Sequence, residues 1–360
     1  MHRKSAVAIL TVPAVVVIAL AWQNAASQSR TSSETAGVGA ATAAAPVARL
    51  PWGEPDLQGI WSSGYIETPL ERPDEFGGRE FLTDDEVRKE LERLSGQQDH
   101  STGGSAPATP RPGDTGTYNS AFSGRGRDVI RTRRTSQVID PKDGKIPWKP
   151  EIRERVAKEV FTNTGTRGRV RGEDNERGGD GPEDRPNDRC LGFALPLRFG
   201  AWETGGAHHR IVQTPGAVSI YYEYGPHGGA YRTIPIGGGP HLPPHIRQWL
   251  GDARGRWEGD TLVVDTTNFT NRTNFEGSRE NLHLMERFTR TAPDLLMYHA
   301  AFEDPTAFTR LWTIEIPMTR KGDKENQIFE SACHEGNYAM TGILAGARAR
   351  DKAETAKRSR

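Results

Sequence analysis

The segment at residues 281–288 places ionisable side chains among apolar ones at a spacing suited to proton transfer. Alternate side chains of a β-strand point to opposite faces, so a strand here carries Glu286 on one face and His283 on the other. The neighbours divide in the same way: Leu282, Leu284 and Phe288 accompany Glu286, and Met285 and Arg287 accompany His283. If one face lines a ligand cavity, His283 or Glu286 is a candidate proton-transfer group. The alternative is a solvated face on which Glu286 forms a cross-strand ion pair.

A second segment with reactive side chains, residues 333–338, stands at the end of a predicted strand. His334 lies beside Glu335, and a histidine next to a carboxylate can act as a general base near neutral pH. Cys333 and His334 could instead form a nucleophile and its base. In the structural alternative, His334 and Asn337 cap the strand end.

Histidines also gather in the Gly/Pro-rich loop at residues 238–245. His241 and His245 have a spacing that suits two metal ligands on one helix, but two prolines stand between them. Together with the His208-His209 pair they could bind zinc or copper. Because these histidines match no ligand pattern, we predict neither a metal site nor a cofactor.

Two charged residues and several aromatic residues could contact a ligand. Arg247 and Asp252 flank a predicted short helix, where they could form a salt bridge or Arg247 could bind a substrate carboxylate. The large aromatic residues that would either line a hollow barrel or pack its core are Tyr221, Tyr222, Tyr224, Trp249, Trp257 and Trp312. The candidate catalytic residues are therefore His283, Glu286, His334 and Glu335. The candidate substrate-binding residues are His241, Arg247, Trp249, Tyr222, Trp312 and Asn337.

Short segments rich in β-branched and aromatic residues must position these side chains. The predicted strands are residues 210–213, 217–224, 231–236, 261–269, 282–291, 295–303, 310–318 and 328–333. Turn-forming residues separate them, so we predict a mainly β fold, an antiparallel lipocalin-like barrel or closed sheet with a few short helices and long loops. The stretch before the fourth strand predicts a helix at residues 243–250 that ends at Gly251, and then a turn at residues 258–260.

Helical patterns occur before the β-rich part. Thr83 and Glu86 have the spacing of a capping box, which predicts a helix that runs to about Leu94. A second amphipathic helix is predicted at residues 147–161, and Trp61 is expected to pack an extended N-terminal arm onto the core.

The N-terminus has the order of parts of a secretory signal peptide: basic residues 2–4, an apolar run at residues 6–22 and small residues before Gln28. An uncleaved membrane anchor is the alternative. Export to an oxidising compartment favours one disulfide between Cys190 and Cys333, and two buried thiols are the alternative. We divide the chain into a signal peptide (1–27), a flexible leader (28–50), an arm with two helices and disordered loops (51–189), a β-rich core (190–346) and a charged C-terminal tail (347–360).

Composition limits the kinds of partner. The 360 residues include 47 basic and 47 acidic side chains, so a balanced charge gives no reason to expect nucleic acid. Arginine and glycine alternate at residues 163–188, but acidic residues match the basic ones there, which favours a solvated loop over an RNA-binding segment. We expect no stable membrane insertion after the signal peptide is removed, and the sequence leaves the oligomeric state open.

Several motifs are similar to those of a known family. The stretches IRQWLGD-x-RG-x-WEGDTLVVDTTNF, ENLHL-x-ERF and ACHEGNY resemble an uncharacterised family of exported bacterial proteins. The resemblance covers about residues 51–349 and implies a β-rich exported protein, and it assigns no catalytic residue.

These observations lead to two main hypotheses. The first is an exported, cofactor-independent lyase, isomerase or hydrolase that uses acid–base chemistry on an apolar small molecule in a β-barrel cavity. The second is a periplasmic or secreted carrier that binds such a molecule without catalysis. A histidine and a carboxylate together inside the barrel favour the enzyme, whereas histidines outside an apolar interior favour the carrier. A third hypothesis is a secreted protein that binds a partner through its aromatic arm.

Overall fold

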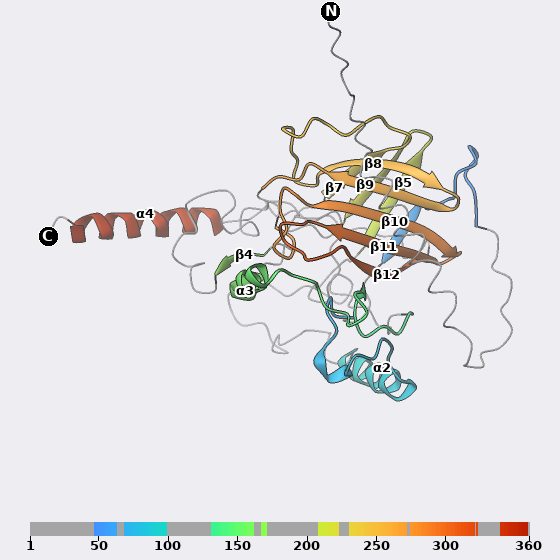
Figure 1. Cartoon of the computed structure of the whole chain (residues 1–360), viewed down its shortest axis with the longest axis horizontal. Coiled ribbons are helices and arrows are strands. Elements are labelled where there is room, and N and C mark those ends of the chain that lie inside the picture. The colour runs from blue at the N-terminus through green and yellow to red at the C-terminus, as the bar shows by residue number, and fades with distance from the viewer. Residues whose placement is uncertain are drawn as a thin grey trace, which may run out of the picture. The chain divides into compact units, whose positions relative to one another are not determined.

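One large antiparallel sheet organises the computed structural model of the protein (Figure 1). The structure describes residues 47–62, 68–98, 131–161, 167–170, 208–222, 230–271, 274–320, 322 and 339–358. The strands follow one another across the sheet in the order β7-β6-β5-β1-β12-β11-β10-β9-β8, and β2 pairs with β12. The strands of this sheet are β1 (Gly59–Ser62), β2 (Val138–Asp140), β5 (His208–Thr214), β6 (Ala217–Tyr222), β7 (Ala230–Pro235), β8 (Asp252–Glu258), β9 (Thr261–Thr267), β10 (His283–Ala292), β11 (Leu295–Glu303) and β12 (Trp312–Arg320). A separate two-stranded sheet pairs β3 (Glu159–Phe161) with β4 (Arg167–Val170).

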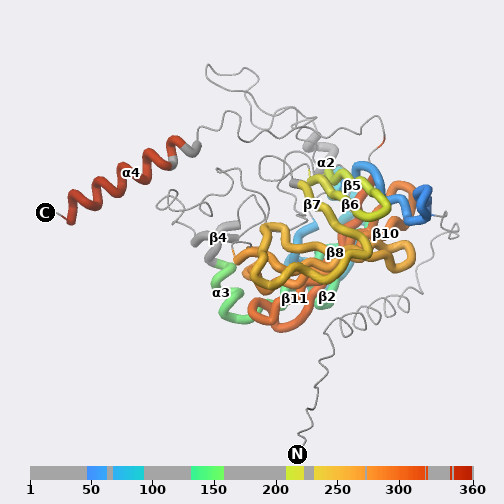
Figure 2. The backbone as a smooth tube through the Cα atoms, turned by 90° about the horizontal axis from the view of Figure 1, so that it is seen from above, coloured from blue at the N-terminus to red at the C-terminus, as the bar shows by residue number. Residues whose placement is uncertain are grey.

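The two ends of this strand order meet, so the sheet is a nearly closed barrel. Ile236, just after β7, forms a parallel bridge with Gly255 of β8, and the Gly237 N–H donates to the Gly255 carbonyl at 3.0 Å. A Cβ atom on Gly255 would lie 2.6 Å from Ile236 Cδ1 and 2.8 Å from Ile234 Cγ2, so the strands approach closely because this residue is glycine. The predicted mainly β barrel is therefore confirmed. Figure 2 shows β5, β6 and β7 grouped together, as their pairing requires.

Alternation along the strands builds the barrel interior. In β6 every second side chain is buried. In β9 the inner side chains Leu262, Val264 and Thr266 are buried, and Val263 of the other side is buried as well. The inner set continues into the neighbouring strands at the paired positions. The largest fully buried side chains are Trp61, Trp312, Tyr298, Phe269, Phe288 and Phe302. Trp61 belongs to β1, which lies between β5 and β12, so the N-terminal arm contributes a strand to the middle of the sheet.

Helices lie outside this pairing. They are a 3₁₀ turn, η1 (Asp74–Phe76), and the α-helices α2 (Asp84–Gln98), α3 (Pro150–Lys158) and α4 (Ala339–Arg358). The predicted capping box is present at the start of α2, because the Glu86 N–H donates to Thr83 Oγ1 and the Thr83 N–H donates to Glu86 Oε2. In α3, Ile152 and Val156 are buried. Within the described ranges, no helix combines the length and apolar character needed to cross a bilayer.

The stretch before β9 differs from the prediction. Residues 243–250 form turns instead of a helix, and the predicted fourth strand is preceded by a further strand, β8. The side-chain amide of Asn268 donates to the carbonyl oxygens of Leu242, Pro243 and Ile246, which fixes the segment in a non-helical path. The turn predicted at residues 258–260 is confirmed, since Gly259 has a positive φ of 59° between β8 and β9.

Candidate functional site

The two candidate catalytic residues of β10 lie on opposite sides of the sheet. Glu286 is fully buried in the barrel interior, whereas His283 faces outward with 24% of its side chain exposed. This follows from the alternation predicted for the strand. The two side chains therefore belong to different sites and cannot act together on one reacting atom.

A polar group lies inside the barrel around Glu286. The Arg232 guanidinium from β7 contacts both carboxylate oxygens of Glu286, at 3.0 and 2.5 Å. Arg232 also donates to Thr266 Oγ1 of β9 at 2.7 Å, and the Tyr298 hydroxyl of β11 donates to Glu286 Oε1 at 3.1 Å. We call Arg232, Thr266, Glu286, Tyr298 and the adjacent Tyr222 the interior cluster. It joins strands from both ends of the sheet order.

Electrostatics keep the interior arginine charged and the two tyrosines neutral. Burial opposes the charge on Arg232, but the Glu286 carboxylate and the Tyr222 phenol outweigh burial and raise the pKa of the guanidinium. Burial, together with the nearby Glu286 charge, raises the pKa of Tyr222 and of Tyr298. His209 stacks edge-on against Tyr222 with ring centroids 5.2 Å apart, and burial lowers its pKa to about 3. The His209 imidazole is therefore neutral at physiological pH.

Apolar side chains surround the interior cluster. Arg232 stands opposite Ile220, and Glu286 stands between Val264 and Ala300 in the strand register. A buried ion pair recovers little of the cost of removing its two charges from water, so a barrel does not need one in order to be stable. Its presence among apolar neighbours marks this part of the interior as a candidate binding site.

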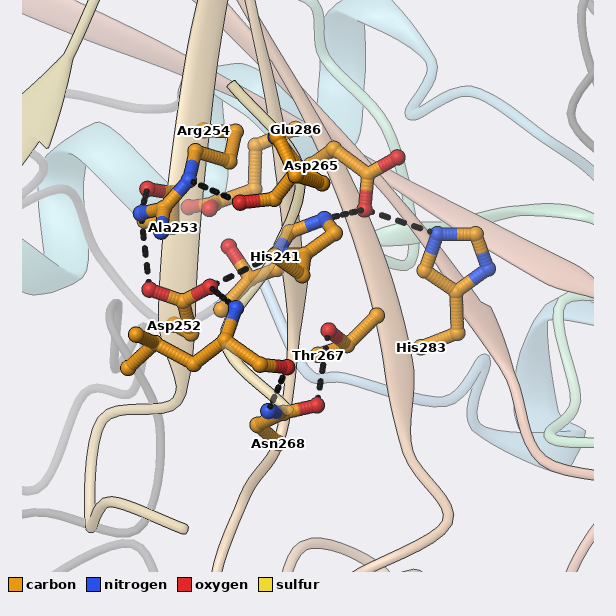
Figure 3. Close-up of polar contacts among 12 residues, drawn as sticks. His241, Asp252, Ala253, Arg254, Asp265, Thr267, Asn268, His283 and Glu286 are labelled. Carbon is orange, nitrogen blue, oxygen red and sulfur yellow. Dashed lines mark hydrogen bonds and ion pairs between the residues drawn. The ribbon is translucent and has the colours of Figure 1, made fainter. Parts of the chain in front are cut away.

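A second polar group lies on the outer side of β8, β9, β10 and β11 (Figure 3). His283 Nε2 lies 3.0 Å from Asp265 Oδ1, and His283 Nδ1 lies 3.2 Å from Glu303 Oε2. His241 Nε2 lies 3.3 Å from the same Asp265 oxygen, and His241 Nδ1 lies 2.9 Å from Asp252 Oδ2. We call His241, Asp252, Asp265, His283 and Glu303 the outer cluster. It is a chain in which each histidine lies between two carboxylates.

The loop between β7 and β8 holds His241 in this chain. The Leu242 N–H donates to Asp252 Oδ2 at 2.9 Å, and Arg254 contacts the other Asp252 oxygen at 2.7 Å. Asn268, which has a positive φ of 58°, orients its amide toward the carbonyl groups of the same loop. Asp252 is therefore a positioning residue that fixes both the backbone and the imidazole.

The outer cluster favours a protonated His283. Burial alone would lower the pKa of His283, but hydrogen bonds and charge from Asp265 and Glu303 raise it above the ordinary value. For Asp265 the directions are reversed. Burial alone would raise its pKa, but hydrogen bonds and charge from His283 and His241 outweigh burial and lower it. Both ring nitrogens of His283 face carboxylate oxygens, so a doubly protonated ring satisfies both contacts.

The other predicted site residues that the structure describes have structural contacts. Arg247 donates to the carbonyl oxygens of Phe269 and Glu280, at 3.1 and 2.6 Å. Trp249 lies in an exposed turn, and Trp312 is fully buried against Phe302 with ring centroids 4.3 Å apart.

The histidines considered as metal ligands do not come together. His241 belongs to the outer cluster, His245 is exposed, and His209 is interior. In the described part of the chain, no three histidine, cysteine or carboxylate side chains are grouped to hold a metal ion.

Several predicted residues lie outside the described residues. They are Cys190, Cys333, His334, Glu335 and Asn337. The proposed disulfide and the second catalytic segment therefore stay predictions.

The sequence prediction did not include Arg232, Asp265, Tyr298 or Glu303. One pattern could have indicated Arg232, because it shares the apolar side of its strand with Ile234. No comparable pattern indicates Asp265, whose partners come from other strands and from the loop before β8.

Comparison with known proteins gives a distant structural likeness. No family model matches the chain, and no curated protein matches its sequence. Two solved structures that match are crystal structures of the fluorescent protein UnaG, the wild type and a mutant. Each is 12% identical, and each match covers 32% of this chain and 72% of that chain, with TM-scores of 0.20 and 0.21. The barrel assignment therefore rests on the strand pairing.

Proposed function

We propose that this protein binds an apolar small molecule with one polar end in the interior of its barrel, at the interior cluster. The Arg232–Glu286 pair carries the proposal, because it is a buried, hydrogen-bonded ion pair in a stretch of wall whose register neighbours Ile220, Val264 and Ala300 are apolar. Such a wall suits the apolar body of a ligand, and the cluster suits its polar end. We further propose that the ligand is carried and not chemically changed.

The position of the histidines supports carriage over catalysis in the interior. His283 and His241 are on the outer side of the sheet, away from Glu286. The interior His209 has a pKa of about 3 because of burial, so it is a poor general base at neutral pH. Glu286 is engaged by Arg232 and Tyr298, which leaves it poorly placed to take a proton from a ligand.

Native mass spectrometry of the purified full chain tests this proposal. We expect a co-purifying organic mass that disappears on denaturation, and rebinding of an apolar probe such as 1-dodecanol. Tyr298→Phe removes a hydroxyl group of the interior cluster and should lower the affinity for the probe several-fold. Arg287→Gln changes the outer side of the neighbouring strand β10 and is the matched control, since Arg287 contacts Glu258. Loss of binding in Arg287→Gln but not in Tyr298→Phe would place the ligand outside the barrel.

The outer cluster supports a second candidate function, acid–base catalysis by His283. This histidine is partly exposed and is oriented by two carboxylates, which is an arrangement typical of a general acid or base. Hydrolysis of a series of 4-nitrophenyl esters provides a probe. His283→Gln should remove any activity above background, whereas His299→Gln, which changes another histidine–carboxylate contact of the outer side, should retain it. Equal rates in both variants would exclude this role.

Export is also proposed, on the basis of the basic residues 2–4, the apolar run 6–22 and the small residues before Gln28. N-terminal sequencing of the protein made in a secreting host should give a mature chain that begins at Gln28. Intact mass without reductant should be two hydrogens lower than with reductant if Cys190 and Cys333 are bridged. A retained residue 1 would favour the membrane-anchor alternative.

A further inference from the structure

The charged side chains of the interior cluster balance one another. Arg232 and Glu286 form one pair, and both are almost completely buried. Farther along β10, Arg290 approaches the Asp56 carboxylate at 3.7 Å. The remaining polar groups near Arg232 are neutral, because burial raises the pKa values of Tyr222 and Tyr298 and lowers that of His209.

A third charge would have no partner at the interior cluster. Both Glu286 oxygens already accept hydrogen bonds from Arg232, and the same guanidinium also donates to Thr266. A ligand carboxylate would add an uncompensated negative charge beside Glu286, and an ammonium would add an uncompensated positive charge beside Arg232. Burying an unpaired charge costs far more than burying a hydrogen-bonded hydroxyl.

Neutral hydroxyl groups at the cluster suit a neutral ligand group. Tyr298 and Thr266 carry hydroxyls that both donate and accept hydrogen bonds. Their neighbours in the strand register are apolar, since Tyr298 stands between Phe288 and Ile316. The chemistry therefore combines a small uncharged polar point with an apolar and aromatic wall.

We propose that the interior cluster selects an apolar molecule whose buried end is an uncharged hydroxyl or carbonyl group, and that it discriminates against carboxylates and ammonium ions. This inference rests on the proposed binding function and adds the class of ligand. Selectivity arises because the Arg232–Glu286 pair balances its own charge without the ligand, while the buried Arg232 Nε has no hydrogen-bond partner among the described residues and could donate to a neutral oxygen.

Three probes with the same number of carbon atoms test this selectivity: 1-dodecanol, dodecanoate and dodecylammonium. At about pH 7.5 the last two are ionised. Each is titrated into the full-length protein by calorimetry, 1-dodecanol below its solubility limit and the two ions below their micelle concentrations. We expect 1-dodecanol to bind at least about tenfold more tightly than either ion, which corresponds to about 1.4 kcal/mol. A carboxylate or ammonium that binds more tightly than the alcohol would overturn the inference and leave the binding function intact. If none of the three binds, the proposed function itself fails.

Two variants shift the charge balance in opposite directions. Glu286→Gln leaves Arg232 without its carboxylate partner. The affinity for dodecanoate should therefore rise at least about tenfold relative to the affinity for 1-dodecanol. Arg232→Gln leaves the Glu286 carboxylate, so dodecylammonium should gain instead. The control Glu258→Gln removes an outer carboxylate that contacts Arg287 and should keep the wild-type order. An unchanged order in both folded interior variants would contradict the proposal, and if neither variant folds the wild-type order alone decides.

Discussion

Arg232 and Glu286 each depend on the other, because both are buried and together they form the ion pair of the interior cluster. Removing one partner leaves an uncompensated charge in an apolar setting, which costs more than the pair itself contributes. Replacing both partners by apolar residues of similar size avoids that cost. The pair therefore provides a test that separates stability from binding.

We predict that Glu286→Leu lowers the free energy of unfolding by about 3–5 kcal/mol. The double variant Arg232→Met with Glu286→Leu should recover most of this loss, because no unpaired charge remains. Urea denaturation followed by tryptophan fluorescence measures both values. A double variant that is less stable than Glu286→Leu would contradict the expected cost of the lone charge. The double variant should also have lost the 1-dodecanol affinity.

At the outer cluster, the contribution of His283 to stability should depend on pH. Its pKa is raised in the folded protein, so its contribution is fully present below the unfolded value of 6.5 and is lost as the pH rises through the folded pKa. The Asp265 pKa is lowered, so its contribution is present above 3.8 and is lost as the pH falls through the folded pKa. The contact is therefore strongest between those two limits.

The measurement is the difference in unfolding free energy between the wild type and His283→Gln, from mildly acidic through neutral to alkaline pH. We expect the difference to be largest in mildly acidic solution and to shrink toward alkaline pH. A difference that grows with rising pH would have the wrong sign and would show that His283 is stabilised as the neutral imidazole.

For the site residues, the sequence could predict only which side chains of one strand share a face of the sheet. The alternation of β10 correctly separated His283 from Glu286, because that separation depends on neighbours in the sequence. The pairing of Arg232 with Glu286 was not predictable, since it depends on the barrel closure that brings β7 near β10. The contact of Asp265 with His283 was not predictable either, since it depends on the register of β9 against β10.

Among the elements, β7 and β8 close the barrel through the tight approach at Gly255. We predict that Gly255→Ala destabilises the protein by about 1–3 kcal/mol, because the new methyl group meets Ile236 and Ile234 at less than contact distance. Gly216→Ala is the control, since a Cβ atom there has no neighbour within 4 Å. Thermal unfolding of both variants gives the comparison. Equal melting temperatures would mean that the strands separate at Gly255 without cost.

A strand or helix could be predicted where its sequence pattern and its turn or cap lie close together in the chain. The hairpin strands β10 and β11 and the capped helix α2 were expected close to their observed places, because each has its pattern and its turn or cap within a few residues. The strand β8 was missed because it alternates charged and small residues around Gly255. The helix expected at residues 243–250 was wrong because Asn268, from beyond β9, holds that segment in turns.

For the molecule as a whole, β1 joins two sets of strands that are otherwise local in sequence. It pairs with β5 on one side and β12 on the other, and its Trp61 is fully buried. We predict that Trp61→Ala costs about 3–5 kcal/mol in unfolding free energy. The variant should also unfold less cooperatively, with β5 to β7 losing amide protection before β9 to β11 in hydrogen exchange. Uniform loss of protection would show that the two sets do not depend on β1.

The mainly β class could be predicted because alternating short strands and turns extend over much of the sequence. The order of the strands in the sheet could not be predicted, since β1 pairs with β5 and β12, which are distant in sequence, and no local sequence pattern indicates such pairing.

The place of β1 also has a consequence for the order in which the barrel can be completed. Among the strands of this sheet that the structure describes, β1 is the first along the chain and β12 is the last. A polypeptide that emerges from a ribosome or a translocation channel with its N-terminus first exposes β1 long before β12 follows. Both hydrogen-bonding edges of β1 are open to other chains until β5 follows, and the edge that pairs with β12 stays open until β12 is made. Late pairing of this kind is slow and prone to aggregation. The first strand to appear is thus among the last to be flanked on both sides.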